Sequence, residues 1–120
     1  MIALGTQGGL VKLVDLKRNK VISTLNIAEA SSKPQEESTV FSLDWNTDGF
    51  LAVASTEELV YIKDFDPDTM SFVEDTSLTV YSQSRCVQWG PLNQKLLAAG
   101  LFNGNIVVFD MDKAEVKQLL

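Results

Sequence analysis

The chain has 120 residues, of which 45% are hydrophobic and 22% are charged. This length suits one folded domain, and the composition excludes an intrinsically disordered segment. The net charge of −6 disfavours direct nucleic-acid binding, which needs a clustered Lys and Arg surface. No apolar run approaches the ~20 residues that cross a bilayer, and a single cysteine cannot form an intrachain disulfide. We therefore expect an intracellular protein, cytoplasmic or nuclear, without a membrane span.

A 14-residue pattern occurs three times without gaps, at residues 2–15, 51–64 and 97–110. Each copy begins with an aliphatic residue and alanine, passes through a polar or glycine-containing turn, and ends with aliphatic residues before an aspartate. This arrangement predicts two short strands joined by a hairpin. The closing aspartates are 49 and 46 residues apart, a period typical of stacked or radially arranged supersecondary units.

Further strands flank the three copies. In chain order, we expect a strand at 20–25, an exposed connection at 28–37 rich in Ser, Lys, Pro and Glu, and a strand at 40–45. A strand at 70–73 follows the second copy, a strand at 85–89 precedes the third, and 115–120 forms a last strand or begins a helix. The sequence thus predicts eleven antiparallel strands grouped as three, four and four.

The four-strand unit resembles a WD40 repeat, in which a small-residue strand, a glycine-containing turn and a final Asp recur. The matching aspartates are Asp15, Asp64 and Asp110. The resemblance implies an all-β fold of antiparallel four-stranded meander blades, forming a partial β-propeller over residues 1–120. The blades would span approximately 1–27, 38–74 and 80–120. No copy has the literal Trp-Asp pair and the chain has no histidine, so the repeats are divergent.

The number of blades is too small for a closed ring, because propellers close with about 4–8 blades. We expect either a piece of a longer protein or a chain that completes a propeller with another chain. In isolation, the open edges and apolar faces predict self-association.

The resemblance also implies one rim that gathers the turns between second and third strands and the connections between blades. Its candidate partner-binding residues are Glu36, Glu37, Glu57, Glu58, Phe102 and Asn103. An acidic rim favours association with a basic segment of a protein partner. Phe102 would be an interface anchor at a hairpin tip, or would instead pack against the neighbouring blade.

The leading functional hypothesis is a non-enzymatic protein–protein interaction scaffold within a multiprotein assembly. The alternative is a fragment of a propeller enzyme whose catalytic residues lie outside this chain. We predict no catalytic residue, cofactor or metal site, because Ser–His–Asp chemistry needs the histidine that the chain lacks. Asp64, Asp66 and Asp68 resemble a calcium loop, but Thr69 stands where the sharp turn needs glycine. An Asp-Pro-Asp turn explains them more simply.

Equivalent positions in the copies predict packing roles. Trp45 and Trp89 end the two opening strands, and we expect them to pack between blades rather than form an aromatic cage. Cys86 is expected to be a small buried hydrophobic residue. One alanine per copy should be buried where blades approach closely, namely Ala3, Ala52 and Ala98.

Overall fold

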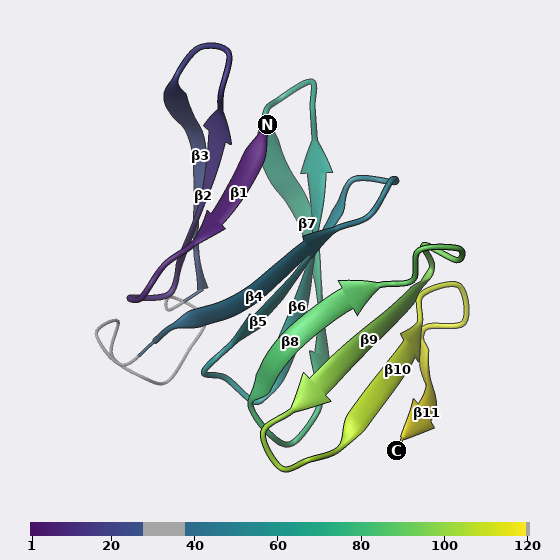
Figure 1. The fold of residues 1–120 in the computed structure, drawn as a ribbon. Coiled ribbons are helices and arrows are strands. Elements are labelled where there is room, and N and C mark those ends of the chain that lie inside the picture. The colour runs from purple at the N-terminus through teal and green to yellow at the C-terminus, as the bar shows by residue number, and fades with distance from the viewer. Residues whose placement is uncertain (28–37, 120) are drawn as a thin grey trace.

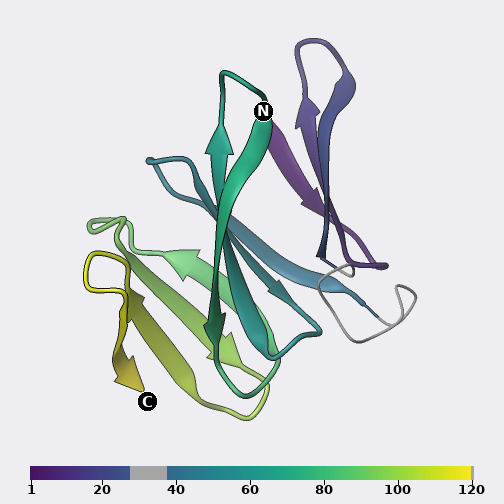
Figure 2. The same cartoon turned by 180° about the vertical axis from the view of Figure 1, so that it is seen from behind.

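The computed structural model describes residues 1–27 and 38–119 and arranges them in three antiparallel sheets (Figures 1 and 2). Sheet 1 contains β1 (Ile2–Gly5), β2 (Leu10–Asp15) and β3 (Lys20–Asn26). Sheet 2 contains β4 (Val40–Trp45), β5 (Phe50–Ser55), β6 (Leu59–Asp66) and β7 (Ser71–Thr79). Sheet 3 contains β8 (Ser84–Trp89), β9 (Leu96–Leu101), β10 (Ile106–Asp110) and β11 (Glu115–Leu119).

Each sheet is a meander in which consecutive strands pair. The all-β class, the eleven strands and their grouping as three, four and four are therefore confirmed for the described residues. No sheet closes on itself, and this part of the chain has no helix long and apolar enough to cross a membrane. The expected connection at 28–37 lies outside the described residues.

The three copies of the 14-residue pattern have the same strand register. The equivalent pairs are Ala3 with Leu13, Ala52 with Ile62, and Ala98 with Val108. The opening strands of sheets 2 and 3, β4 and β8, also have the same register, because Trp45 pairs with Leu51 and Trp89 pairs with Leu97. A position in one sheet can therefore be compared directly with the same position in the others.

Sheet 2 lies between sheets 1 and 3 and packs against both (Figure 1). The face toward sheet 1 includes Leu51, Val53 and Tyr61. The face toward sheet 3 includes Ala52, Ala54, Val60 and Ile62. Both faces of β5 are buried, whereas β9, which is equally apolar, alternates between buried and accessible residues because a described layer covers only one of its faces.

The turns that follow β2, β6 and β10 are also equivalent, but the predicted turn aspartate of sheet 2 was wrong. The Asp15 and Asp110 carboxylates accept backbone N–H groups two residues ahead. In sheet 2 this role belongs to Asp66, whose Oδ1 accepts the Asp68 N–H at 2.9 Å, and not to Asp64. Asp64 instead pairs with Phe50 and Glu74, because the β6–β7 hairpin is two residues longer. The fourth residue after each turn aspartate has positive φ, namely Asn19, Met70 and Ala114.

The fourth strand of sheet 2 was predicted too short. The sequence indicated residues 70–73, but β7 continues to Thr79 because it pairs along the whole of β6. Its Leu78 packs against the core between sheets 2 and 3, which supports the extension. At the C-terminus, the helical alternative is wrong, because residues 115–119 pair with β10 as a strand.

The predicted burial of the three alanines holds in full for only one. Ala52 is completely buried between sheets 2 and 3, and Ala3 is partly buried against sheet 2. Ala98 is exposed, and so is Cys86, which was also expected to be buried. Both lie on the face of sheet 3 that points away from sheet 2, against which no described layer packs. The equivalent positions agree in register but differ in burial because only sheet 2 has neighbours on both faces.

Candidate protein-interaction surface

The β1–β2, β5–β6 and β9–β10 turns lie along one side of the molecule, together with the links between sheets (Figure 1). We call this side the connecting rim; its described parts are residues 6–9, 38–39, 56–58, 80–83 and 101–105. The placement agrees with the arrangement that the repeat resemblance implied. The opposite side carries the hairpin turns that follow β2, β6 and β10.

Backbone hydrogen bonds hold neighbouring segments of the connecting rim together. The Gly8 N–H donates to the Ser38 carbonyl at 2.6 Å, and the Thr56 N–H donates to the Thr39 carbonyl at 3.0 Å. In the same way, the Phe102 N–H donates to the Gln83 carbonyl at 2.8 Å. These bonds make the rim a continuous structured surface rather than a set of independent turns.

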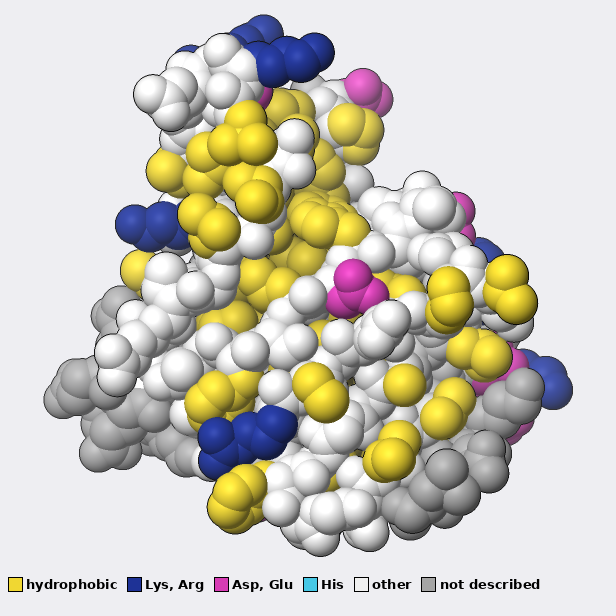
Figure 3. Space-filling model, in the orientation of Figure 1, with side chains coloured by type: hydrophobic (Ala, Val, Ile, Leu, Met, Phe, Trp, Pro, Cys, Tyr) yellow, Lys and Arg dark blue, Asp and Glu magenta, His cyan; other side chains and the backbone are white. Residues whose placement is uncertain are grey.

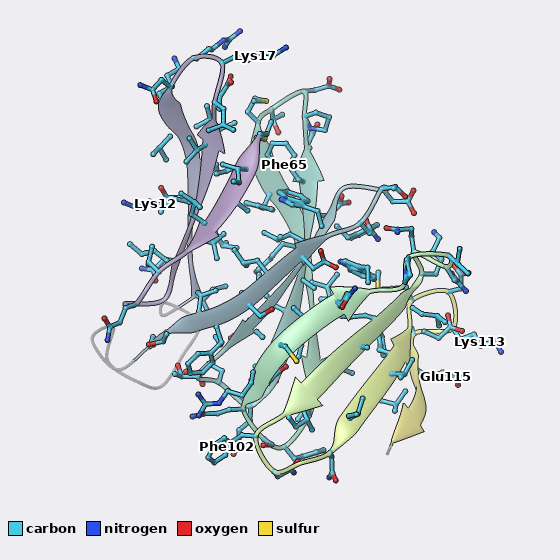
Figure 4. All side chains as sticks on the ribbon, viewed as in Figure 1. Lys12, Lys17, Phe65, Phe102, Lys113 and Glu115 are labelled. Atoms are coloured by element: carbon cyan, nitrogen blue, oxygen red, sulfur yellow. The ribbon has the colours of Figure 1, made fainter. Side chains whose placement is uncertain are left out.

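Phe102 is the most conspicuous apolar side chain of the rim. It is 70% exposed and points outward from the turn between β9 and β10 (Figure 4). The Arg85 guanidinium carbon lies 4.6 Å from the Phe102 ring centroid and 4.3 Å from that of Phe41 in sheet 2. The Phe102 ring is thus largely exposed, and Arg85 joins it to the neighbouring sheet; its role as an interface anchor stays a prediction.

Sequence reasoning did not identify Arg85 and Phe41 as members of this surface. Both occupy the irregular position at which the opening strand shifts register, between Val40 and Ser42 in sheet 2 and between Ser84 and Cys86 in sheet 3. Each lies four residues before the strand's tryptophan. That shared spacing is the signal that could have found them.

The acidic part of the rim is only partly described. Glu58 is exposed and Glu57 is half-buried in the turn between β5 and β6. Asn103 is exposed beside Phe102, and its Oδ1 accepts the Asn105 N–H at 3.0 Å. Glu36 and Glu37 lie outside the described residues. Lys17 lies on the β2–β3 turn at the opposite side of the molecule from Phe102 (Figure 4).

The turn beside Phe102 is not the two-residue type that an Asn-Gly pair favours. A two-residue turn at Asn103-Gly104 would place both residues at positive φ, but only Gly104 has positive φ, at 92°. The Leu101 N–H donates to the Asn105 carbonyl and the Gly104 N–H donates to the Leu101 carbonyl, so three residues, 102–104, form the loop. This longer loop carries Phe102 clear of the sheet.

The two tryptophans lie between the layers, as expected, but in different surroundings. Trp89 is 3% exposed, and its backbone and indole N–H groups donate to Asp44 Oδ2 at 2.7 Å and to the Asp44 carbonyl at 3.0 Å. Trp45 is half-buried and lies beside Phe65 and Phe72, with ring centroids 5.9 and 6.2 Å away.

The aspartates that resemble a calcium loop form an ordinary turn in this structure. Asp66 accepts the Asp68 N–H, which is the Asx turn that the simpler interpretation predicted. Among the residues with described side chains, no group of three His, Cys, Asp or Glu is arranged to hold a metal ion.

Comparisons with known proteins do not assign a family. No protein-family model matches the sequence, and no curated protein matches it significantly. What the chain itself shows is an open stack of three antiparallel sheets with a continuous connecting rim.

Proposed function

We propose that this chain is a non-enzymatic, WD40-like protein–protein interaction module that works within a larger assembly. Its connecting rim would contact a basic or amphipathic segment of a protein partner. The observation that carries the proposal is the 70% exposure of Phe102 above Arg85, at the tip of a structured turn. The single cysteine and the absence of histidine fit an intracellular interaction module.

The chemistry of the rim suits a protein partner. Aromatic and arginine side chains are the residues that most often dominate binding energy in protein interfaces. The contact with Arg85 restricts the Phe102 ring, which lowers the side-chain entropy that would be lost on binding. The carboxylates of Glu57 and Glu58 would act at longer range and mainly accelerate association with a basic partner.

The test uses the chain as bait in affinity purification followed by mass spectrometry, comparing the wild type with Phe102→Ala. We expect a partner to be retained by the wild type and lost with the variant. Leu92→Ala is the matched control, because Leu92 is fully exposed on the β8–β9 turn, away from the connecting rim. Equal retention by all three baits would refute an interface at Phe102.

Kinetics then separate the two roles on the rim. Phe102→Ala should chiefly speed dissociation, whereas reversing Glu57 and Glu58 to lysine should slow association and reduce its dependence on salt. The melting temperature should change little in Phe102→Ala, because an exposed cation–π contact contributes only about 0.5–1 kcal/mol. A large loss of stability with unchanged dissociation would mean that Phe102 serves packing alone.

A further inference from the structure

Tyr81 lies in the link between β7 and β8 and has an unusual backbone conformation. Its φ is 59°, in the left-handed region that a bulky side chain rarely adopts. The other described non-glycine residues with positive φ are Asn19, Met70 and Ala114, which occupy equivalent turns of the three sheets. Tyr81 lies outside these turns. Strain of this kind persists only where the surrounding structure enforces it, and it points to a function for the side chain that is presented.

The residues on both sides of Tyr81 are anchored, whereas Tyr81 itself is 82% exposed. Val80 is buried, and its N–H donates to the Glu58 carbonyl at 3.1 Å. Ser82 is buried as well, and its Oγ accepts the Asn103 N–H at 3.3 Å. The link is therefore bonded to the β5–β6 turn on one side and to the β9–β10 turn on the other, and it displays Tyr81 between them.

We propose that Tyr81 and Phe102 together bind an extended, proline-rich segment of a protein partner, with a basic residue at one end of the segment. This two-ring site rests on the proposed function of the connecting rim and names the chemistry of the partner. The described parts of the rim contain two exposed large hydrophobic side chains, and these are Tyr81 and Phe102.

The two rings are close enough for one short segment to reach both. The Phe102 N–H donates to the Gln83 carbonyl, and Tyr81 is two residues from Gln83. The backbones at Tyr81 and Phe102 therefore lie within about 12 Å of each other. A polyproline II segment rises about 3.1 Å per residue, so four or five residues span that distance.

Turns offer aromatic faces and isolated hydrogen-bond donors, and these suit a polyproline II segment. Such a segment has no internal hydrogen bonds, so its carbonyls remain available to donors, and its stiff backbone loses little entropy on binding. The Tyr81 hydroxyl and the Arg85 guanidinium beside Phe102 are donors of that kind. A β-strand partner would instead need the edge of a strand, and residues 80–83 and 102–105 are not strand residues.

The charges beside the two rings set the polarity of the segment. Glu58 is exposed, and its carbonyl is bonded to Val80, next to Tyr81. Arg85 lies at the other ring, with its guanidinium carbon 4.6 Å from the Phe102 centroid. Figure 3 shows a Lys or Arg side chain between hydrophobic side chains at the lower left, where Figure 4 places Phe102. A basic residue of the partner is therefore attracted to the Tyr81 end and repelled from the Phe102 end.

The test selects phage-displayed random dodecapeptides on the immobilised 120-residue chain, after depletion on Tyr81→Gly. This variant removes the ring and relieves the positive φ, so its melting temperature should not fall. We expect the selection to enrich peptides with prolines three residues apart, which lie on one face of a polyproline II helix, and with Lys or Arg at one end. Lack of enrichment, or enriched peptides without proline, would overturn the inference.

The most enriched peptide is then labelled with fluorescein and titrated by fluorescence anisotropy. Tyr81→Gly and Phe102→Ala should each weaken binding by about tenfold or more, and so should replacement of the peptide's prolines by alanine. Tyr81→Phe removes only the hydroxyl donor and should weaken binding by about two- to tenfold. Leu92→Ala is the matched control, because Leu92 is exposed away from the rim, and binding should stay within about twofold. Binding that survives the loss of either ring contradicts the two-ring site.

The bait comparison separates this inference from the rim proposal when Tyr81→Gly is added to it. A partner that is lost with both Phe102→Ala and Tyr81→Gly supports the two-ring site. A partner lost with Phe102→Ala but kept with Tyr81→Gly leaves the rim proposal standing and overturns the two-ring site. A lowered melting temperature of Tyr81→Gly would show that the ring serves packing, and would also overturn it.

Discussion

The contact between Asp44 and Trp89 gives the sharpest stability prediction for the packing of sheets 2 and 3. Asp44 Oδ2 accepts the backbone N–H of Trp89 at 2.7 Å, and Trp89 is 3% exposed. A hydrogen bond to a charged group contributes about 1.5–3 kcal/mol. Because Asp44 is half-buried, we expect Asp44→Ala to lower the free energy of unfolding by about 2 kcal/mol, leaving a buried N–H without its acceptor.

Asp44→Asn keeps an acceptor oxygen without the charge, and should cost only about 1 kcal/mol. Both variants can be compared by urea unfolding followed by far-UV circular dichroism, at low protein concentration. Asp48→Ala is the control, since its contact with Lys95 is an exposed ion pair at 3.5 Å that contributes about 0–1 kcal/mol. The reasoning fails if Asn and Ala at position 44 are equally destabilising, or if Asp44→Ala changes stability by less than about 0.5 kcal/mol.

Three further predictions concern packing and assembly. Ala52→Leu should cost about 1–3 kcal/mol by overpacking, whereas Ala98→Leu, on the open face, should stay within about 0.5 kcal/mol in the same urea assay. Gly5→Ala should lower the free energy of unfolding by about 1–3 kcal/mol, because the new Cβ would lie 2.5 Å from Val40 Cγ1. Thermal melting tests this, and an unchanged melting temperature would show that Val40 moves aside freely. The isolated chain should self-associate with rising concentration in sedimentation velocity, and a stable monomer throughout would contradict the exposed faces described above.

Local regularities made much of the architecture predictable. Strand pairing has a period of two residues and turn residues act over short distances, so the 14-residue pattern already determines register. That is why Ala3, Ala52 and Ala98 occupy equivalent pairs in all three sheets. The grouping of the strands followed for the same reason. The extended β6–β7 hairpin escaped prediction because its length depends on pairing with β6 rather than on its own residues.

The interaction surface was only partly predictable. Phe102 could be recognised as an aromatic residue in a turn, and it is exposed on the connecting rim. The contact with Arg85 and Phe41 could not, because it joins side chains from two sheets that are far apart in the sequence. Whether Phe102 binds a partner stays a prediction that the bait comparison tests.

The sequence by itself determined the strand count and the equivalent pairing of the three copies, because these depend on neighbouring residues and on ladder pairing, but it misplaced the turn of the longer β6–β7 hairpin. Only the tertiary structure decided which equivalent residues are buried. Ala52 is enclosed because layers cover both faces of sheet 2, whereas Ala98 and Cys86 face outward from sheet 3. Whether a residue is buried depends on the layer that packs against its face. The sequence of an alternating strand is the same whether or not that layer is present.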